Sequence, residues 1–354
     1  MAAITTATDN TAFGYNALLN NTGSENTAIG SRSLDANTSG TRNTAVGDLT
    51  ASLNTTGTDI TAVGWNALRN STGSNNTAVG SRSLDANTSG AENTAIGDLA
   101  LSANTTASNN TAVGKSALQA NTTGTYNSAL GKNALLSNTT GTANVAVGGL
   151  ALDACTTGDD NVAVGYNSLS NLTTGNSCIA MGRAALNANT TGVANVAIGD
   201  QALENNSTAN NNAAFGHHAL VTNTTGYNNV AVGNYCLRYN TEGFENVAVG
   251  YNALEDNTTG DFNIGVGRSA LANQTTANHN TAIGFKSGED ITTGQQNTAV
   301  GSQSLMNGTT AAQNVSLGAF TLETLTSGAY NVAVGNQALK ESTTSSYNTA
   351  VKVH

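Results

Sequence analysis

Short apolar phrases recur along the chain at nearly constant intervals. Residues 144–148 read NVAVG, and similar phrases end at 20 glycines from Gly14 to Gly335. Their spacing is 17 residues everywhere except at 14→30 and 64→80, where it is 16. Within each phrase the Thr/Val and Val/Ile positions alternate with Asn, Ala and Gly, which is the period of a β-strand. The pattern predicts one short strand in every repeat, with its Val/Ile side facing the core.

The rest of the repeat follows the consensus G-x-x-A-L-x-x-N-T-T-G-x-x-N-(T/V)-A-(V/I), with Leu four residues after the glycine in 18 of 20 cases. The NTTG segment has turn chemistry, because Asn and Gly accept left-handed conformations and Thr can bond the local backbone. Both 16-residue repeats are shortened in this segment, to NNTG and NSTG. We therefore expect this turn to shorten without disturbing the rest of the repeat.

A unit of 17 residues is too short for two helices and a loop, and it suits two short strands and two turns. We predict an all-β fold, a parallel β-solenoid (β-roll) of about 21 rungs that forms a single repeat domain over residues 1–354. Equivalent residues should then stack in columns about 4.8 Å apart, so that Asn and Thr form ladders along the axis.

The Ala/Gly side of the strand is smooth enough for another chain to approach it closely, since Ala is replaced only by Gly265 and Ser316. We therefore expect a homo-oligomer, with a trimer as the first hypothesis. The predicted chain–chain packing face comprises the small residues of the Val-containing phrases: Ala146, Gly148, Ala163, Gly165, Ala197, Gly199, Ala231 and Gly233.

Composition narrows the function classes. Charged residues make up 10% of the chain, aromatic residues 5%, and proline is absent, so neither a conventional globular core nor a typical disordered chain is expected. A net charge of -10 argues against nucleic acid as a partner. No apolar run approaches the roughly 18 residues of a membrane-spanning helix, and the N-terminus lacks the regions of a signal peptide. We expect no membrane insertion.

Aromatic residues are the best candidates for adhesion to glycans. Because the interior positions are taken by small or aliphatic residues, these rings should lie outside, where they can stack on sugars. They could equally cover turns or lie at a chain interface. The predicted adhesive residues all follow a phrase glycine: Tyr15, Trp65, Tyr166, Tyr251 and Phe285.

Catalytic and cofactor chemistry has little support. The acids are scattered, and His217 and His218 are interpreted as a coincidental pair on one rung, so no catalytic residue, metal or cofactor is predicted. Cys155, Cys178 and Cys236 lack metal-ligand spacing and are expected to stay thiols.

Two repeated features allow other functions. The Asn-Thr-Thr turns match the N-glycosylation sequence, although a plain Asn ladder is the simpler interpretation. The regular Thr columns raise an ice-binding hypothesis, which is weakened because the two turn threonines are adjacent and so point in different directions.

Neither end of the chain resembles a cap, and both end in incomplete coils. Met1 and Ile4 continue the repeat phase backwards, while Val351 and Val353 belong to a last coil that stops where the next copy would resume. We hypothesise that copies stack head to tail through these four residues. The alternative is that the chain is a fragment, or that other proteins cover its ends.

Phrases such as NTAVGSRSLDANTSG and NVAVGYNSLSNLTTG resemble repeats of phage tail-fibre and other fibrous surface proteins. NTAVG also resembles the SVAIG-type motif in head domains of trimeric autotransporter adhesins. The resemblance covers residues 4–354 and implies a thin left-handed β-roll with three chains side by side. The adhesin repeat is shorter than 17, so its register does not transfer to this chain.

These observations predict a non-enzymatic structural fibre on a virion or microbial surface, hence an extracellular or virion-surface location. The alternative is a self-assembling extracellular filament, and the third hypothesis is an ice-binding protein.

Overall fold

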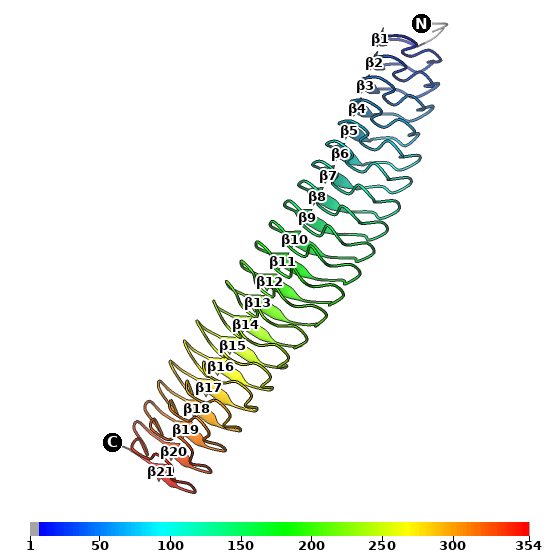
Figure 1. The fold of residues 1–354 in the computed structure, drawn as a ribbon. Coiled ribbons are helices and arrows are strands. Elements are labelled where there is room, and N and C mark those ends of the chain that lie inside the picture. Colours follow the sequence, from blue (N-terminus) through cyan, green and yellow to red (C-terminus); the bar gives the residue numbers. More distant parts are fainter. Residues whose placement is uncertain (1–6, 354) are drawn as a thin grey trace. The chain divides into compact units, whose positions relative to one another are not determined.

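The computed structural model describes residues 7–353, and every regular element in this range is a three-residue β-strand. None of these residues forms a helix, so none forms one long and apolar enough to cross a membrane. The chain divides into two compact units, Met1–Ser177 and Cys178–His354. Each unit is a parallel β-solenoid, as predicted, with one strand on each rung (Figure 1).

The strands of the first unit are β1 (Thr11–Phe13), β2 (Thr27–Ile29), β3 (Thr44–Val46), β4 (Thr61–Val63), β5 (Thr77–Val79), β6 (Thr94–Ile96), β7 (Thr111–Val113), β8 (Ser128–Leu130), β9 (Val145–Val147) and β10 (Val162–Val164). Those of the second unit are β11 (Ile179–Met181), β12 (Val196–Ile198), β13 (Ala213–Phe215), β14 (Val230–Val232), β15 (Val247–Val249), β16 (Ile264–Val266), β17 (Thr281–Ile283), β18 (Thr298–Val300), β19 (Val315–Leu317), β20 (Val332–Val334) and β21 (Thr349–Val351).

Strands on neighbouring rungs pair in parallel and in phase, so equivalent residues lie beside one another. Ala28 pairs with Ala45 across β2 and β3. The two shortened repeats keep this register, since Thr11 pairs with Thr27 and Thr61 with Thr77. The prediction that the NTTG turn can lose a residue without disturbing the phase is confirmed.

The prediction of a second strand on each rung is wrong. The segment after the phrase glycine is a turn in which residues two and four positions after the glycine adopt left-handed conformations, as at Arg32 (φ 52°) and Leu34 (φ 50°). Left-handed backbone costs a non-glycine residue about 1–2 kcal/mol. Burial of the Leu side chain offsets this cost, because Leu34 is fully enclosed. Backbone bonds between rungs, such as Leu34 N–H to Thr50 C=O (3.1 Å), hold the turn.

The core direction of the strand is also the reverse of the prediction. The central Ala of the phrase points inward and is fully buried, whereas the flanking Thr/Val and Val/Ile side chains point outward, as the exposure of Ile29 (40%) and Ile96 (40%) shows. The reason is space. At Gly265, which stands in the Ala column, an added Cβ would lie 3.2 Å from Leu254 Cγ. Each rung interior is already filled by Leu and amide groups, so the strand can contribute only Ala.

Two ladders of buried asparagines complete the interior. In the strand ladder the Asn43 N–H donates to Asn26 Oδ1 (3.0 Å), and Asn43 Nδ2 donates to Gly57 C=O (2.9 Å). In the turn ladder Asn54 Nδ2 donates to Asn37 Oδ1 (3.1 Å) and to Gly57 C=O (3.1 Å). The predicted Asn ladders are therefore confirmed, and they satisfy the polar groups that a narrow solenoid must bury.

Two rungs show how the interior volume is conserved when Leu is missing. Gly288 occupies the Leu position of one rung, and the same rung carries the fully buried Ile291 in place of the turn asparagine. A Cβ at Gly288 would lie 3.0 Å from Ile291 Cδ1, so the isoleucine reaches into this space. Ala51 occupies the Leu position of another rung, which carries the buried Ile60 in the strand asparagine column.

Candidate interaction surface

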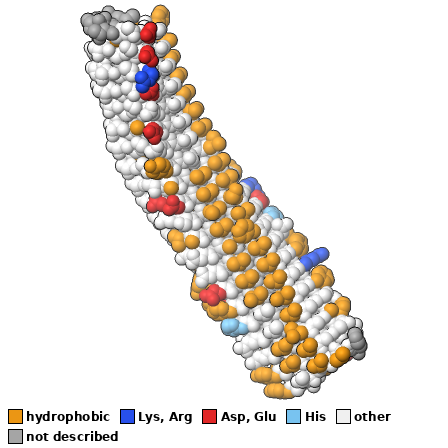
Figure 2. All heavy atoms as spheres, turned by 180° about the vertical axis from the view of Figure 1, so that it is seen from behind, with side chains coloured by type: hydrophobic (Ala, Val, Ile, Leu, Met, Phe, Trp, Pro, Cys, Tyr) orange, Lys and Arg blue, Asp and Glu red, His pale blue; other side chains and the backbone are white. Residues whose placement is uncertain are grey.

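The outward side of the strands is the main exposed apolar surface, and we call it the strand face. Each strand contributes its first and third residues, which form two parallel columns. The third-residue column is apolar in every strand, from Phe13 in β1 to Val351 in β21. The first-residue column is Thr in β1 to β7 but Ile, Val or Ala in β11 to β16. Figure 2 shows a narrow line of hydrophobic side chains in the first unit and a broader band in the second.

The predicted packing face of Ala and Gly does not lie on the outside. Ala146, Ala163, Ala197 and Ala231 are fully buried within their own chain, so their side chains cannot contact a neighbouring chain. Their uniformity reflects the narrow rung interior.

The glycines of the same predicted face, Gly148, Gly165, Gly199 and Gly233, serve contacts between rungs of one chain. Gly148 has φ 136°, and a Cβ there would lie 2.5 Å from the carbonyl oxygen of Gly165 on the next rung. Gly165, Gly199 and Gly233 have similar φ values of 132°, 139° and 132°. These positions need glycine because the backbones of successive rungs approach so closely.

The five predicted adhesive aromatics lie on the outside, as expected. Their exposed fractions range from 43% to 73% for Phe285, Tyr251, Trp65, Tyr166 and Tyr15. They lie just after the C-terminal end of the strand, beside the strand face. Their binding to glycans stays a prediction.

A second row of rings lies on the other side of the strand face, in the second unit. Tyr227 stacks on Phe244 with centroids 4.9 Å apart, Phe244 meets Phe262 edge-on at 5.2 Å, and Phe262 stacks on His279 at 5.0 Å. The repeat pattern does not mark this row, because the four residues do not share one repeat phase. A search for aromatics one or two positions before the strand asparagine could have found it.

Polar and ionisable groups form one notable cluster beside the strand face. His217, His218 and Tyr235 pack ring against ring, and Asp200 lies on the preceding rung, 3.6 Å from the His217 Nδ1. Burial, and then the neighbouring His217 and Arg238 charges, hold the pKa of His218 below its ordinary value. This environment favours the neutral imidazole of His218 over its protonated form.

The three cysteines replace ladder or core residues and are buried. Cys155 stands in the turn asparagine column, Cys178 in the strand asparagine column and Cys236 in the inward Ala column after the glycine. Burial raises the pKa of the Cys155 and Cys236 thiols to about 11, and raises that of Cys178 as well. Such thiols are poor nucleophiles. The buried Asn138 Oδ1 has no partner, because Cys155 interrupts the ladder there.

The Asn-Thr-Thr turns keep their asparagines inside the solenoid and their threonines at its surface. The turn asparagines, such as Asn54 and Asn121, are fully buried, and their amide nitrogens donate within the ladder, so the folded chain does not present them for glycan attachment. The first turn threonines bond along the axis, as with Thr122 Oγ1 to Thr139 C=O (3.0 Å).

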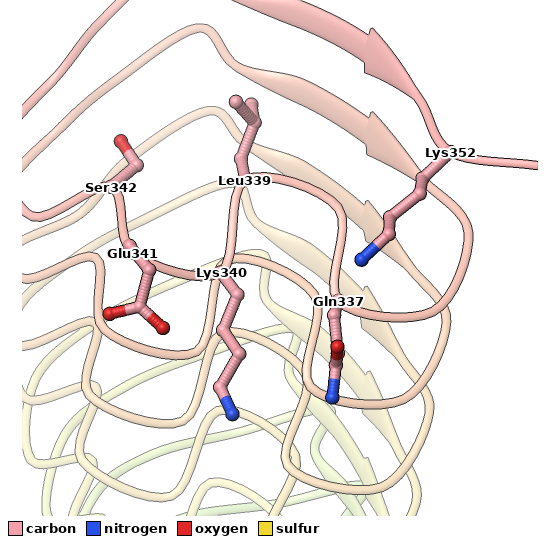
Figure 3. A pocket seen from close by; sticks show the side chains of 6 residues that line it. All are labelled: Gln337, Leu339, Lys340, Glu341, Ser342 and Lys352. Atoms are coloured by element: carbon pink, nitrogen blue, oxygen red, sulfur yellow. The ribbon is translucent and has the colours of Figure 1, made fainter. Parts of the chain in front are cut away.

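The last rung of the second unit bears a hollow of about 430 Å³, lined by Gln337, Leu339, Lys340, Glu341, Ser342 and Lys352 (Figure 3). Leu339 and Lys340 point in opposite directions there. Leu339 is half-buried, whereas the equivalent Leu322 one rung earlier is fully enclosed by its neighbours.

Val351 and Val353, predicted for end-to-end contacts, are 69% and 79% exposed, and Met1 and Ile4 lie outside the described residues.

Comparison with known proteins adds no family. No family model matches the sequence, and no curated protein matches it.

Proposed function

We propose that this protein is a non-enzymatic structural fibre of a virion or microbial surface, assembled from copies of itself through the strand face. The observation that supports this role is the unbroken apolar column along the outward side of each unit. A fibre needs length and lateral stiffness, and packed parallel solenoids provide both.

The size of the strand face supports association. In the second unit eleven strands contribute to it. With strands about 4.8 Å apart and a strip about 10 Å wide, its area is on the order of 500 Å². That equals the largest apolar patch of an ordinary monomer, and such patches commonly mark interaction sites.

The repeat itself selects the partner. A surface whose side chains recur about every 4.8 Å is matched at every rung only by a surface with the same spacing. Another copy of this chain has that spacing by construction, and its columns would interdigitate with the first. We propose a trimer, in which each copy turns its strand face toward the other two.

Analytical ultracentrifugation tests this assembly. The wild-type chain should sediment at a multiple of its 35.5 kDa mass. A double variant, Val230→Lys with Val232→Lys, should sediment as a single chain, because four or more cations would be buried unpaired in each assembly. Its circular dichroism should stay that of the wild type, since both side chains point outward.

The matched control is Thr259→Lys, an exposed turn position in the same unit, which should leave the assembly intact. Wild-type protein that sediments at 35.5 kDa at all concentrations would rule out the proposed assembly.

We also propose that the fibre presents its aromatics to cell-surface glycans. Trp65 is half-exposed, and it lies beside the strand face, where it stays accessible when neighbouring copies cover the strands. Loss of glycan-array binding in Trp65→Ala, with unchanged sedimentation, would support this role. Unchanged glycan binding together with lost assembly would instead assign Trp65 to a chain interface.

A further inference from the structure

The solenoid register brings three metal-ligating side chains together in the second unit. Asp200 and His217 are 17 residues apart, so they occupy the same column on successive rungs. His218 is the next residue and has a left-handed backbone (φ 56°), which places its ring only 3.9 Å from that of His217 by their centroids. One ligand atom from each of the three residues lies within 4.8 Å of the others.

A partner already orients the carboxylate of the cluster. Arg183, on the rung before Asp200, reaches it with both ends of its guanidinium, Nε to Oδ1 at 2.9 Å and Nη2 to Oδ2 at 3.0 Å. Metal-binding carboxylates are commonly held by such outer hydrogen bonds, which fix their direction.

A hydrogen-bonded chain also sets the tautomer of His218. Gln201 Nε2 donates to Glu204 Oε2 (2.7 Å), because a carboxylate can only accept. Gln201 Oε1 therefore faces His218 Nε2 at 2.6 Å, and as an oxygen it can only accept a proton from this nitrogen. The lone pair of His218 is consequently on Nδ1. This carboxylate–amide–imidazole chain is the kind of support that metal-ligating histidines use.

We propose that Asp200, His217 and His218 form a binding site for a divalent transition-metal ion of the Zn²⁺ class. Two imidazoles and one carboxylate form a ligand set that binds such ions in preference to Ca²⁺ or Mg²⁺. Three protein ligands leave a tetrahedral ion one position for water. Among residues 7–353 no other group of three such side chains comes together in this way.

The sequence alone did not indicate this site, because the acids are scattered along the chain and two adjacent histidines on one rung resemble a coincidental pair. Asp200 is not part of a recurring acid pair. It becomes relevant only through the 17-residue offset, which is the distance between neighbouring rungs.

Titration calorimetry of the full chain with ZnCl₂ tests the proposal. We expect saturable binding of one ion per chain. His217→Ala, His218→Ala and Asp200→Asn should each weaken binding at least tenfold. Gln201→Leu, which touches no ion, should weaken it as well, because the tautomer of His218 is no longer fixed.

The matched control is His279→Ala, an exposed histidine of the same unit outside the cluster, which should leave Zn²⁺ affinity unchanged. Thermal melts by circular dichroism would show that every variant is folded. Zinc X-ray absorption of the wild type should reveal two nitrogen ligands at the roughly 2.0–2.1 Å typical of imidazole. Absence of saturable binding by the wild type, or equal weakening by His279→Ala, would overturn the proposal.

Discussion

The two units share one interior but differ on their outer face. Inside, both place Ala at the centre of the strand, with Gly265 and Ser316 as the exceptions. Outside, the first-residue column is threonine through β1 to β7, whereas β11 to β16 carry Ile, Val or Ala. The interior is therefore constrained by volume in both units, whereas the outer face is not.

The exceptions inside the second unit support this interpretation. Ser316 is buried, and its hydroxyl is satisfied by Ser304 Oγ (2.6 Å) and Thr321 C=O (2.8 Å). A polar residue enters the inward column only where local partners satisfy it. The outer column has no such requirement, because water can satisfy a threonine hydroxyl.

Glycine substitution should have the largest effect, and an equal one in both units. Gly131→Val and Gly216→Val place a Cβ 2.5 Å from the carbonyl oxygen of Gly148 and Gly233, at φ values of 141° and 142°. Neighbouring rungs must separate, so we expect a loss of about 4 kcal/mol or more in the free energy of unfolding, measured by chemical denaturation.

The control for the glycine series is Gly149→Ala in the first unit. Its Cβ would meet nothing closer than Tyr166 Cδ2 at 3.7 Å, so stability should be nearly unchanged. Equal denaturation curves for Gly131→Val and Gly149→Ala would contradict the close approach of the rungs.

Removal of one ladder amide should come next, again with equal effects in the two units. Asn121→Ala breaks bonds to Asn104 (3.1 Å) and Asn138 (2.9 Å), and Asn240→Ala breaks bonds to Asn223 (2.8 Å) and Asn257 (2.7 Å). Each change should cost about 2–3 kcal/mol, because buried amide groups lose their partners. Thermal or chemical denaturation measures the loss, and the exposed Thr123→Ala is the control.

Exchanging Val or Ile for Thr in the first-residue column of the strand face tests self-association separately from folding stability. Val230, Val247 and Ile264 changed together to Thr should weaken self-association roughly 10- to 100-fold, because apolar contacts between copies are lost. The free energy of unfolding should change by less than about 1 kcal/mol.

The reverse exchange, Thr44, Thr61 and Thr77 to Val, should strengthen self-association in the first unit. Concentration-dependent sedimentation measures the self-association of both triple variants. If neither exchange altered association, the difference between the two outer faces would have no role in assembly.

The smallest effect concerns the acids five residues after the phrase glycine. This column has three aspartates in the first unit and four glutamates in the second, namely Glu204, Glu255, Glu289 and Glu323. Burial raises the pKa of Asp35, Asp85 and Asp153, and Asp153 Oδ1 has no partner. A raised folded-state pKa means that stability is gained as pH falls through it. The gain is complete below the unfolded value of about 3.9.

Asp153→Asn should therefore raise the melting midpoint at pH 7 by less than about 2 °C and reduce the gain on acidification. The pKa of Asp59 is shifted in the opposite direction, because hydrogen bonding to Arg42 holds it low. Asp59→Asn should thus not stabilise the chain at pH 7. A melting midpoint of Asp153→Asn that falls at pH 7 would contradict the burial argument.

Much of the fold could be predicted from the sequence, and the candidate site much less. Parallel rungs, Asn ladders and the shortened turns all followed from residues that recur at one phase. The turn that replaces the expected second strand could not be predicted. Its left-handed Leu, as at Leu34, is uncommon, and no residue type in the repeat indicates it. The cluster of Asp200, His217 and His218 occurs once, so no repetition marked it.

The sequence by itself determined the period, the phase and the parallel stacking, because a residue that recurs every 17 positions can satisfy its neighbours only in register. It did not determine which side of NVAVG faces inward. Period-two alternation shows which residues share a face, but both assignments have the same alternation. Only the tertiary structure decided it: Leu and two amides already fill each rung, so Ala fits inside and Val must lie outside, where it is available to another chain.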